Sequence, residues 1–116
     1  MILTGSQIAQ EISQGHITFE PFDPAQLNPN SINYRLGPIL KVFEASDEHN
    51  RHRFRAVELP DDGYVLEPHR MYLGHTLEVI GSSRYAMSLI GRSSMGRLGL
   101  FLQLSANLGH TTSCHQ

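Results

Sequence analysis

The sequence has a single cysteine, Cys114, which excludes an internal disulfide and a thiolate cage for a metal ion. It also has little excess charge: a net charge of −2, with one lysine among nine basic residues, leaves no broad cationic face for polymeric nucleic acid. No window reaches the roughly 18 apolar residues that a membrane-spanning helix needs, so no membrane partner is expected. The first residues lack the basic start and apolar run of a secretory signal, so we expect a cytoplasmic protein.

What the chain does contain is typical of one β-rich domain. Its 116 residues, 40% of them hydrophobic and 17% charged, fit a single domain over residues 1–116. Short apolar or alternating runs between Gly, Pro, Asp and Ser predict strands of an all-β barrel or sandwich. A polar stretch at residues 46–53 is expected to be a solvated loop. The predicted strands are residues 16–20, 33–36, 39–43, 64–66, 71–80, 85–90 and 101–105.

One short helix is predicted near the N-terminus. Thr4 and Gln7 have the spacing of a capping box, in which the hydroxyl and the amide each bond the other's backbone N–H. The isoleucines that follow are one helical turn apart, and Gly15 stands where a helix would stop. This pattern predicts an amphipathic helix over residues 6–14.

The segment at residues 91–100 carries the most chemical information. It follows an apolar run and reads as a turn into a short helix, where free backbone N–H groups favour an anion. Two hydroxyls, of Ser93 and Ser94, and two guanidinium groups, of Arg92 and Arg97, suit phosphate oxygens. The alternative is purely structural: Ser93 or Ser94 caps the helix, and both arginines lie on the surface.

This segment also resembles a known family. Gly-Arg-Ser-Ser at residues 91–94, followed by Arg-Leu-Gly-Leu at 97–100, resembles the signature of the dCTP deaminases, which are relatives of the trimeric dUTPases. Tyr-Arg-Leu-Gly at 34–37 and Gly-His-Thr-Leu-Glu at 74–78 resemble the family in the same order. The resemblance implies a mainly β fold. It would be a distorted β-barrel of the dUTPase-like (β-clip) type, with a short N-terminal helix and a short helix after the Gly-Arg-Ser-Ser turn.

The resemblance further implies an activity, hydrolytic deamination of dCTP to dUTP without zinc, and the residues that perform it. Arg92, Ser93 and Ser94 would hold the triphosphate, with Mg²⁺ bound to it. Ser93 and Arg97 would also lie near the cytosine ring and the attacking water, which the backbone carbonyl of Ala106 would orient. The family completes this site across a subunit boundary, which implies a homotrimer or a hexamer of two trimers.

Three features depart from the family's pattern. Its general base is a Glu on the strand after the Ala106 region, expected here beyond Gln116, so we expect the chain to be a fragment that is inactive by itself. His110 stands where relatives carry an Asp that contacts the deoxyribose, and a His can still hydrogen-bond the sugar hydroxyl. Asn33 replaces a family Asp and keeps its hydrogen-bond acceptor.

Other classes of protein fit less of the sequence. A zinc-dependent cytidine-type deaminase needs His-x-Glu and Pro-Cys-x-x-Cys motifs, which are lacking. His110, Cys114 and His115 offer fewer ligands than zinc sites normally use, so no metal site is predicted there. A dUTPase-like pyrophosphatase would activate water with an Asp, and no Asp follows Asp62. A non-catalytic nucleotide-binding protein on the same fold stays open.

Overall fold

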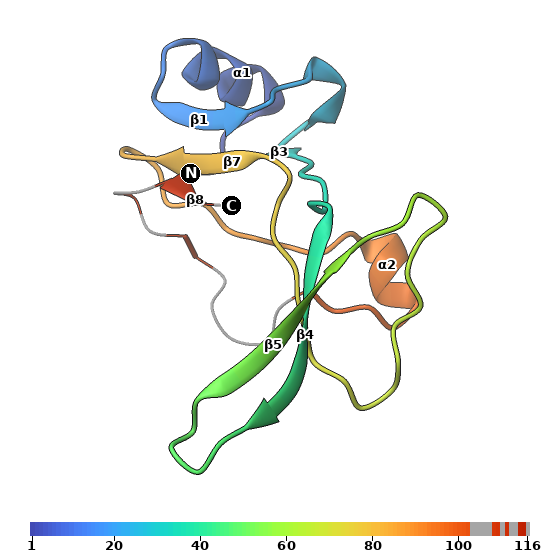
Figure 1. The fold of residues 1–116 in the computed structure, drawn as a ribbon. Helices are drawn as coiled ribbons and strands as arrows, with labels where there is room; N and C mark the ends of the chain where they lie inside the picture. The colour runs from blue at the N-terminus through green and yellow to red at the C-terminus, as the bar shows by residue number, and fades with distance from the viewer. Residues whose placement is uncertain (103–107, 110, 112–113, 116) are drawn as a thin grey trace. The chain divides into compact units, whose positions relative to one another are not determined.

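A computed structural model describes residues 1–102, 108–109, 111 and 114–115. These residues are mainly β with few short helices, as predicted (Figure 1). They fall into two compact units: Met1–Asn33 together with Val79–His115 form unit 1, and Tyr34–Glu78 form unit 2. No helix in the described part of the chain is long and apolar enough to cross a bilayer. That the whole chain forms one domain stays a prediction.

Unit 1 begins with helix α1, Gly5–Ser13, which starts at the predicted capping box. Thr4 Oγ1 accepts a hydrogen bond from the Gln7 N–H at 3.3 Å, and Gln7 Oε1 accepts one from the Thr4 N–H at 2.9 Å. Gln14 is the C-cap, and Gly15 follows with a φ of 76°, a left-handed conformation that glycine adopts at little cost. The predicted helix is therefore confirmed, shifted by one residue.

The main sheet of unit 1 has three antiparallel strands in the order β1-β7-β8. In that order the strands are Ile17–Glu20, Val79–Ser82 and Cys114–His115. The core beside it consists of Phe19, whose side chain is 2% exposed, with the buried Ile8 of α1 and Ile17. The Phe19 ring meets the Phe22 ring edge to face, with 6.4 Å between centroids. The strand predicted at residues 16–20 is confirmed.

A second, two-stranded sheet in unit 1 lies where no strand is predicted. The short helix η1, Pro24–Gln26, leads into strands β2, Leu27–Asn28, and β3, Ser31–Ile32. Asn33 Oδ1 accepts a hydrogen bond from Asn28 Nδ2 at 3.0 Å, so this side chain keeps the acceptor role expected of it. These polar contacts hold together the chain segment that leads from β1 to the first residues of unit 2.

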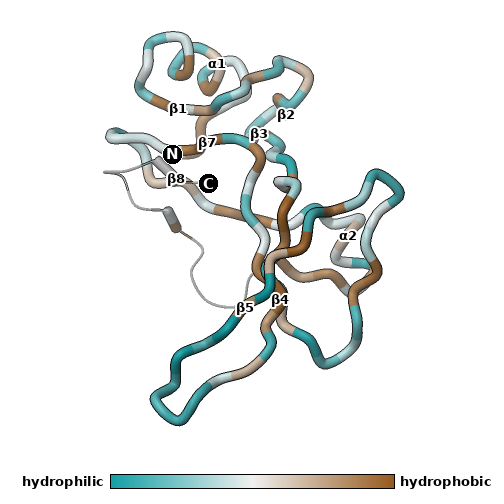
Figure 2. The backbone as a smooth tube through the Cα atoms, viewed as in Figure 1, coloured by the Kyte–Doolittle hydropathy of each residue, from teal (hydrophilic) through white to brown (hydrophobic). Residues whose placement is uncertain are grey.

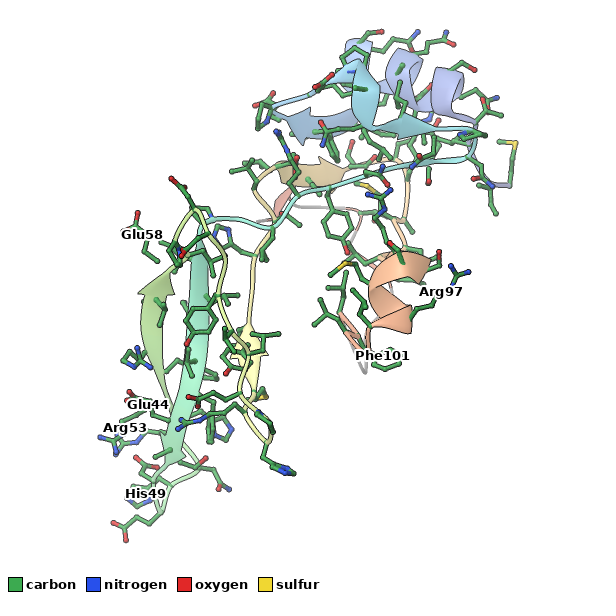
Figure 3. All side chains as sticks on the ribbon, turned by 90° about the vertical axis from the view of Figure 1, so that its right-hand side faces the viewer. Glu44, His49, Arg53, Glu58, Arg97 and Phe101 are labelled. Atoms are coloured by element: carbon green, nitrogen blue, oxygen red, sulfur yellow. The ribbon has the colours of Figure 1, made fainter. Side chains whose placement is uncertain are left out.

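Unit 2 is built on a long β-hairpin, which forms a twisted ribbon in Figure 1. Its strands are antiparallel in the order β5-β4-β6, and they are His52–Glu58, Ile39–Ser46 and Tyr72–Leu73. Leu40 and Val42 of β4 are buried, and the rings of Phe43 and Phe54 meet edge to face at 5.7 Å. Figure 3 shows the exposed charged side chains that project from the hairpin, among them Glu44, His49, Arg53 and Glu58.

The polar stretch at residues 46–53 forms the hydrophilic tip of this hairpin (Figure 2), and the prediction of a solvated loop over its whole length is wrong. β5 begins at His52, so only the turn from Asp47 to Arg51 is loop. Asp47 Oδ1 accepts a hydrogen bond from the Arg51 N–H at 2.9 Å, and Oδ2 one from Arg51 Nε at 2.7 Å. β5 escaped prediction because charged residues on both sides of Phe54 hide the strand's alternation.

Other predicted strands are shorter than expected or are not formed. Residues 64–66 form no strand, and the Tyr64 ring instead packs on Tyr72 with centroids 6.1 Å apart. Residues 33–36 and 85–90 reach only isolated bridges, and residues 71–80 contain two separate strands, β6 and the start of β7. Apolar content predicts burial, but a strand also needs a neighbouring edge with which to hydrogen-bond. Residues 101–102 form no strand, and residues 103–105 of that prediction lie outside the described residues.

The described residues form three small sheets and no closed barrel. Closure needs every strand to be paired on both sides, and β1, β5, β6 and β8 are edge strands of their sheets. The mainly β class is therefore confirmed, and the predicted distorted barrel is not found in this part of the chain.

Unit 2 also contains an ion pair between the buried Glu78 and the half-exposed Arg35. The Glu78 side chain is 0% exposed, and its Oε1 accepts a hydrogen bond from Arg35 Nε at 2.7 Å. Its Oε2 accepts a second bond from the Arg35 backbone N–H at 2.9 Å, and the Leu77 N–H donates to the Arg35 carbonyl at 2.8 Å. This pair ties together the two ends of unit 2, the places where the chain enters it from unit 1 and leaves it again.

Candidate nucleotide site

The segment with the predicted site residues lies in unit 1 and contains helix α2, Ser93–Arg97. Its first turn is closed by the Arg92 carbonyl, which accepts hydrogen bonds from the N–H groups of Met95 and Gly96, both at 3.0 Å. Gly99 follows the helix with a φ of 85°, which an L side chain rarely adopts, so the chain turns away there. The predicted short helix after the Gly-Arg-Ser-Ser turn is confirmed.

The structure bears on the purely structural alternative in two ways: no side chain caps α2, but Arg92 and Arg97 are both exposed, as that alternative expects. The N-cap of α2 is Arg92, with φ −68° and ψ 137°, and no side chain caps the helix. Ser93 and Ser94 are the first two helical residues, where backbone N–H groups have no acceptor one turn earlier. Their hydroxyls are therefore not used as the predicted cap, and the amides point out of the helix start.

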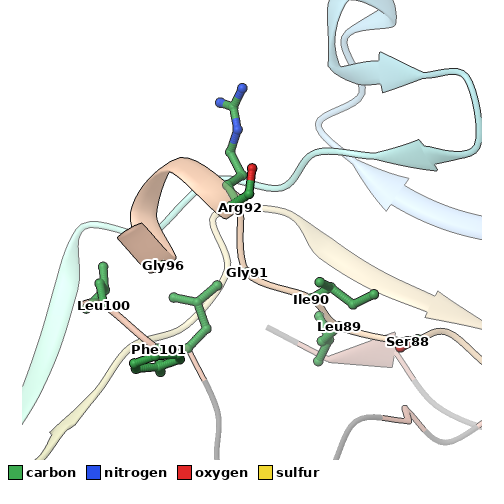
Figure 4. A pocket seen from close by; sticks show the side chains of 10 residues that line it. Ser88, Leu89, Ile90, Gly91, Arg92, Gly96, Leu100 and Phe101 are labelled. Atoms are coloured by element: carbon green, nitrogen blue, oxygen red, sulfur yellow. The ribbon is translucent and has the colours of Figure 1, made fainter. Parts of the chain in front are cut away.

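A pocket of about 400 Å³ lies beside this helix start (Figure 4). Arg92, Ser93 and the backbone of Gly91 supply its polar lining, and Figure 4 shows Arg92 extending away from Leu89 and Phe101. The remaining lining is mostly apolar, and it comprises Ser88, Leu89, Ile90, Gly96, Leu100, Phe101 and Leu102. The composition of this lining, apolar with a few polar groups at one side, is that of small-molecule sites, although the pocket is open to solvent.

Two of the predicted residues, Ser94 and Arg97, lie on α2 but do not line this pocket. Arg97 is the last residue of the helix, and its exposed side chain projects from it (Figure 3). Ala106 and His110 lie outside the described residues. The structure thus brings Arg92 and Ser93 together at one pocket and keeps Ser94 and Arg97 on the same short helix.

The apolar wall of the pocket is the part that sequence reasoning missed. Ile90 is 77% exposed and Phe101 is 74% exposed, values that mark an uncovered apolar patch. The apolar run beside the signature could have indicated this wall, but it reads equally well as a buried strand.

The charges near the site have one sign. From residue 79 to residue 116 the sequence has no Asp or Glu, whereas Arg92 and Arg97 both lie within the signature. Such a segment favours an anionic ligand. No group of three His, Cys, Asp or Glu side chains among the described residues is arranged to hold a metal ion.

The pocket's donor set also bears on Mg²⁺. Hydroxyls, amides and a guanidinium group suit phosphate oxygens, whereas Mg²⁺ prefers carboxylates, phosphates and water. No carboxylate lines this pocket. The residues present therefore fit a metal ion that reaches the site bound to a triphosphate, and not one bound directly by these side chains.

Comparison with known proteins identifies the family. Residues 2–112 match the family model described as dCTP deaminase-like. The chain belongs to this family, as its resemblance in several motifs predicts.

Individual relatives agree with the family match. Over 111 residues the chain is 42% identical to a Clostridium beijerinckii protein named "dCTP deaminase, dUMP-forming", an alignment that covers 94% of this chain and 64% of the relative. It is 40% identical over 112 residues to a "dCTP deaminase" of Rhodopirellula baltica, covering 95% of this chain and 56% of that protein. A Cytophaga hutchinsonii protein named "dCTP deaminase, dUMP-forming" is 39% identical over 116 residues, and the alignment covers 98% of this chain and 66% of that protein. The chain thus spans less than two thirds of the length of these relatives.

Proposed function

We propose that the full-length protein deaminates dCTP hydrolytically to dUTP and ammonia, without zinc. The observation that carries this proposal is the start of α2, where Arg92 and Ser93 border one pocket and no side chain caps the helix. The family to which the chain belongs suggests the ligand that these groups would bind, a pyrimidine deoxynucleoside triphosphate. We also propose that the full-length protein is cytoplasmic and that it assembles as a homotrimer or a hexamer.

The proposed roles follow the groups that each residue offers. Arg92 binds the triphosphate through its planar fork, and the hydroxyls of Ser93 and Ser94 donate to phosphate oxygens. Ser93 and Arg97 also lie near the cytosine ring. The Ala106 carbonyl orients the attacking water, and His110 bonds the sugar hydroxyl. Mg²⁺ accompanies the phosphates and neutralises part of their charge.

Deamination also needs proton transfer. Water adds to C4 of the ring, a proton moves to the leaving amine, and ammonia departs as the carbonyl forms. No carboxylate follows Glu78 in these 116 residues. The family resemblance assigns the general base to a Glu on the strand after the Ala106 region, so we place this step in the full-length protein.

A second candidate function is deamination coupled to pyrophosphate release, which converts dCTP and two waters into dUMP, ammonia and pyrophosphate. The observation that favours it is the name of two of the three relatives above, "dCTP deaminase, dUMP-forming". Both reactions need the same triphosphate contacts, and they differ in whether a second water attacks the α-phosphate. The described residues are compatible with either one.

Chromatographic analysis of the products tests both candidates. The full-length protein is incubated with Mg²⁺ and, in separate reactions, with dCTP, dUTP or dCMP, and ammonia is measured in parallel. We expect ammonia from dCTP in a one-to-one ratio with dUTP. Ammonia with dUMP and pyrophosphate would replace the first candidate by the second. Hydrolysis of dUTP without any action on dCTP would indicate a pyrophosphatase, and nucleotide binding without turnover would indicate a non-catalytic protein.

A further inference from the structure

A cluster of four ionisable side chains lies in unit 1, away from the pocket. The Glu11 carboxylate of α1, which is only 16% exposed, has its Oε2 2.8 Å from Nδ1 of His16. Arg84, which follows β7, has its Nη1 3.8 Å from Glu11 Oε2 and 3.2 Å from the same Nδ1 atom of His16. The Arg84 guanidinium lies 5.6 Å from the centre of the Tyr85 ring, and Tyr85 helps to lower the pKa of the Glu11 carboxyl.

The two contacts of His16 Nδ1 exclude each other. An ionised carboxylate can only accept a hydrogen bond, so the contact with Glu11 needs a proton on Nδ1. A guanidinium group can only donate, so the contact with Arg84 needs a lone pair on Nδ1. One nitrogen atom cannot supply both. The position of the ring proton therefore decides which partner Nδ1 holds: Glu11 when Nδ1 is protonated, in the charged ring or in one neutral tautomer, and Arg84 when a neutral ring carries its proton on Nε2.

The charge of the ring decides what happens to Arg84. A doubly protonated imidazole carries a positive charge, and at 3.2 Å it repels the guanidinium group while binding Glu11. A neutral ring with its proton on Nε2 accepts from Arg84, which then lies between Nδ1 and the Glu11 carboxylate. A neutral ring thus does not repel Arg84 and, when protonated on Nε2, allows a bridge from Arg84 to Glu11 of α1, whereas the charged ring favours a pair confined to residues 11–16.

We propose that His16 acts as a pH-sensitive clasp: when its ring is protonated, Arg84 is released from α1, and the segment after β7 loosens. Residues 83–90 lead directly into the signature segment. Ser82 connects the backbone at His16 to the backbone at residues 84–85. Its Oγ donates a hydrogen bond to the His16 carbonyl at 2.6 Å and accepts bonds from the N–H groups of Arg84 and Tyr85 at 3.1 and 3.0 Å.

Glu11, Arg84 and Tyr85 are the other ionisable groups that face His16. Desolvation raises the pKa of the Glu11 carboxyl, but the hydrogen bonds from His16 and Tyr85 and the charges of His16 and Arg84 outweigh it and hold this pKa below its ordinary value. Desolvation and the neighbouring Glu11 raise the pKa of the Tyr85 hydroxyl. The stability that the Glu11 carboxylate supplies is therefore fully present above the ordinary pKa of a Glu side chain. It is lost only as the pH falls through the lowered pKa of Glu11 in the folded protein. Between about pH 5 and pH 7.5 only a histidine changes charge.

Amide hydrogen exchange of the full-length protein, resolved by NMR and corrected for the intrinsic pH dependence, tests the clasp. We expect the protection of the Arg84 and Tyr85 amides to fall about two- to fivefold from pH 7.5 to pH 5, the range that corresponds to an exposed charge pair. The variant His16→Asn keeps a hydrogen-bonding group near the position of Nδ1 but does not titrate. It should show no such change between the two pH values.

Two further variants make the outcome decisive. His49→Asn removes another exposed histidine, at the tip of the β4–β5 hairpin, and should retain the wild-type change at Arg84 and Tyr85. Arg84→Gln should lower the protection of these amides equally at both pH values. An unchanged protection of the wild-type protein between the two pH values would overturn the proposal. The same pH-dependent loss in His16→Asn would also overturn it.

Discussion

Replacing Arg97 with alanine is expected to lower dCTP turnover by the full-length protein about 100- to 1,000-fold, the loss usual when one charged donor at a reacting centre is removed. The proposed role places its guanidinium group near the ring and the water. Arg97 is exposed at the end of α2, so its removal leaves the packing of unit 1 intact. Steady-state release of ammonia measures the effect, with circular dichroism to confirm that the fold is kept.

The matched control for this prediction is Arg51→Ala. Arg51 is also an exposed arginine, and its Nε bonds Asp47 at 2.7 Å in the hairpin turn. It has no proposed role in the reaction, so turnover should stay close to the wild-type value. Arg97→Lys separates charge from geometry, because lysine keeps the charge but loses the planar fork. Equal losses in Arg97→Ala and Arg51→Ala would show that the site has been assigned to the wrong segment.

Replacing Arg35 with methionine is expected to lower the free energy of unfolding by about 1–3 kcal/mol, the usual cost of removing a partner from a buried polar group, because Glu78 is buried although the Arg35 side chain is half exposed. The cause is Glu78, whose 0% exposed carboxylate loses the Arg35 guanidinium and stays buried with its charge. Methionine preserves most of the length of the side chain, and the bond from the Arg35 backbone N–H to Glu78 is retained. Urea denaturation followed by circular dichroism measures the change.

Arg55→Met is the control for the pair of Arg35 and Glu78. Arg55 Nε lies 3.3 Å from Glu44 Oε1 in the same unit, but the two side chains are 57% and 47% exposed. Water screens such a pair, so its loss should cost at most about 1 kcal/mol. The double variant Arg35→Met/Glu78→Leu removes the buried carboxylate together with its half-exposed partner and should recover much of the stability. A loss in Arg35→Met no larger than that in Arg55→Met would contradict the structural role given to Glu78.

The elements that could be predicted are those specified by short-range interactions. The capping box of α1 needs only Thr4 and Gln7, which bond each other directly, and Gly15 supplies the stop. The short helix α2 follows from a turn and ends before a glycine with positive φ. The first helix is therefore found within one residue of its expected place, and the second lies within residues 91–100, where a short helix was expected.

Strands were harder to predict because each depends on a partner far away in the sequence. β5 looks like a charged loop, yet pairing with β4 and the contact between Phe43 and Phe54 hold it as a strand. Residues 64–66 look like a strand, yet they pair with no strand among the described residues, and the Tyr64 ring packs on Tyr72 instead. Sequence alternation reports which side chains are buried and leaves the choice of partner strand undetermined.

The same distinction holds at the candidate site. Arg92 and Ser93 could be located from their residue types and from the family signature, because both features are local. The apolar wall could not, since Leu89 and Phe101 are brought together only by the turn and helix between them. The roles of Ala106 and His110 stay predictions, as both lie outside the described residues.

A crystal structure of the full-length protein with dCTP and Mg²⁺, obtained with a variant too slow to consume the nucleotide, tests the central claim most directly. We expect the triphosphate oxygens within hydrogen-bonding distance of the Arg92 guanidinium and of the hydroxyls of Ser93 and Ser94. A nucleotide bound elsewhere on the protein, with none of these three side chains touching a phosphate, would contradict it.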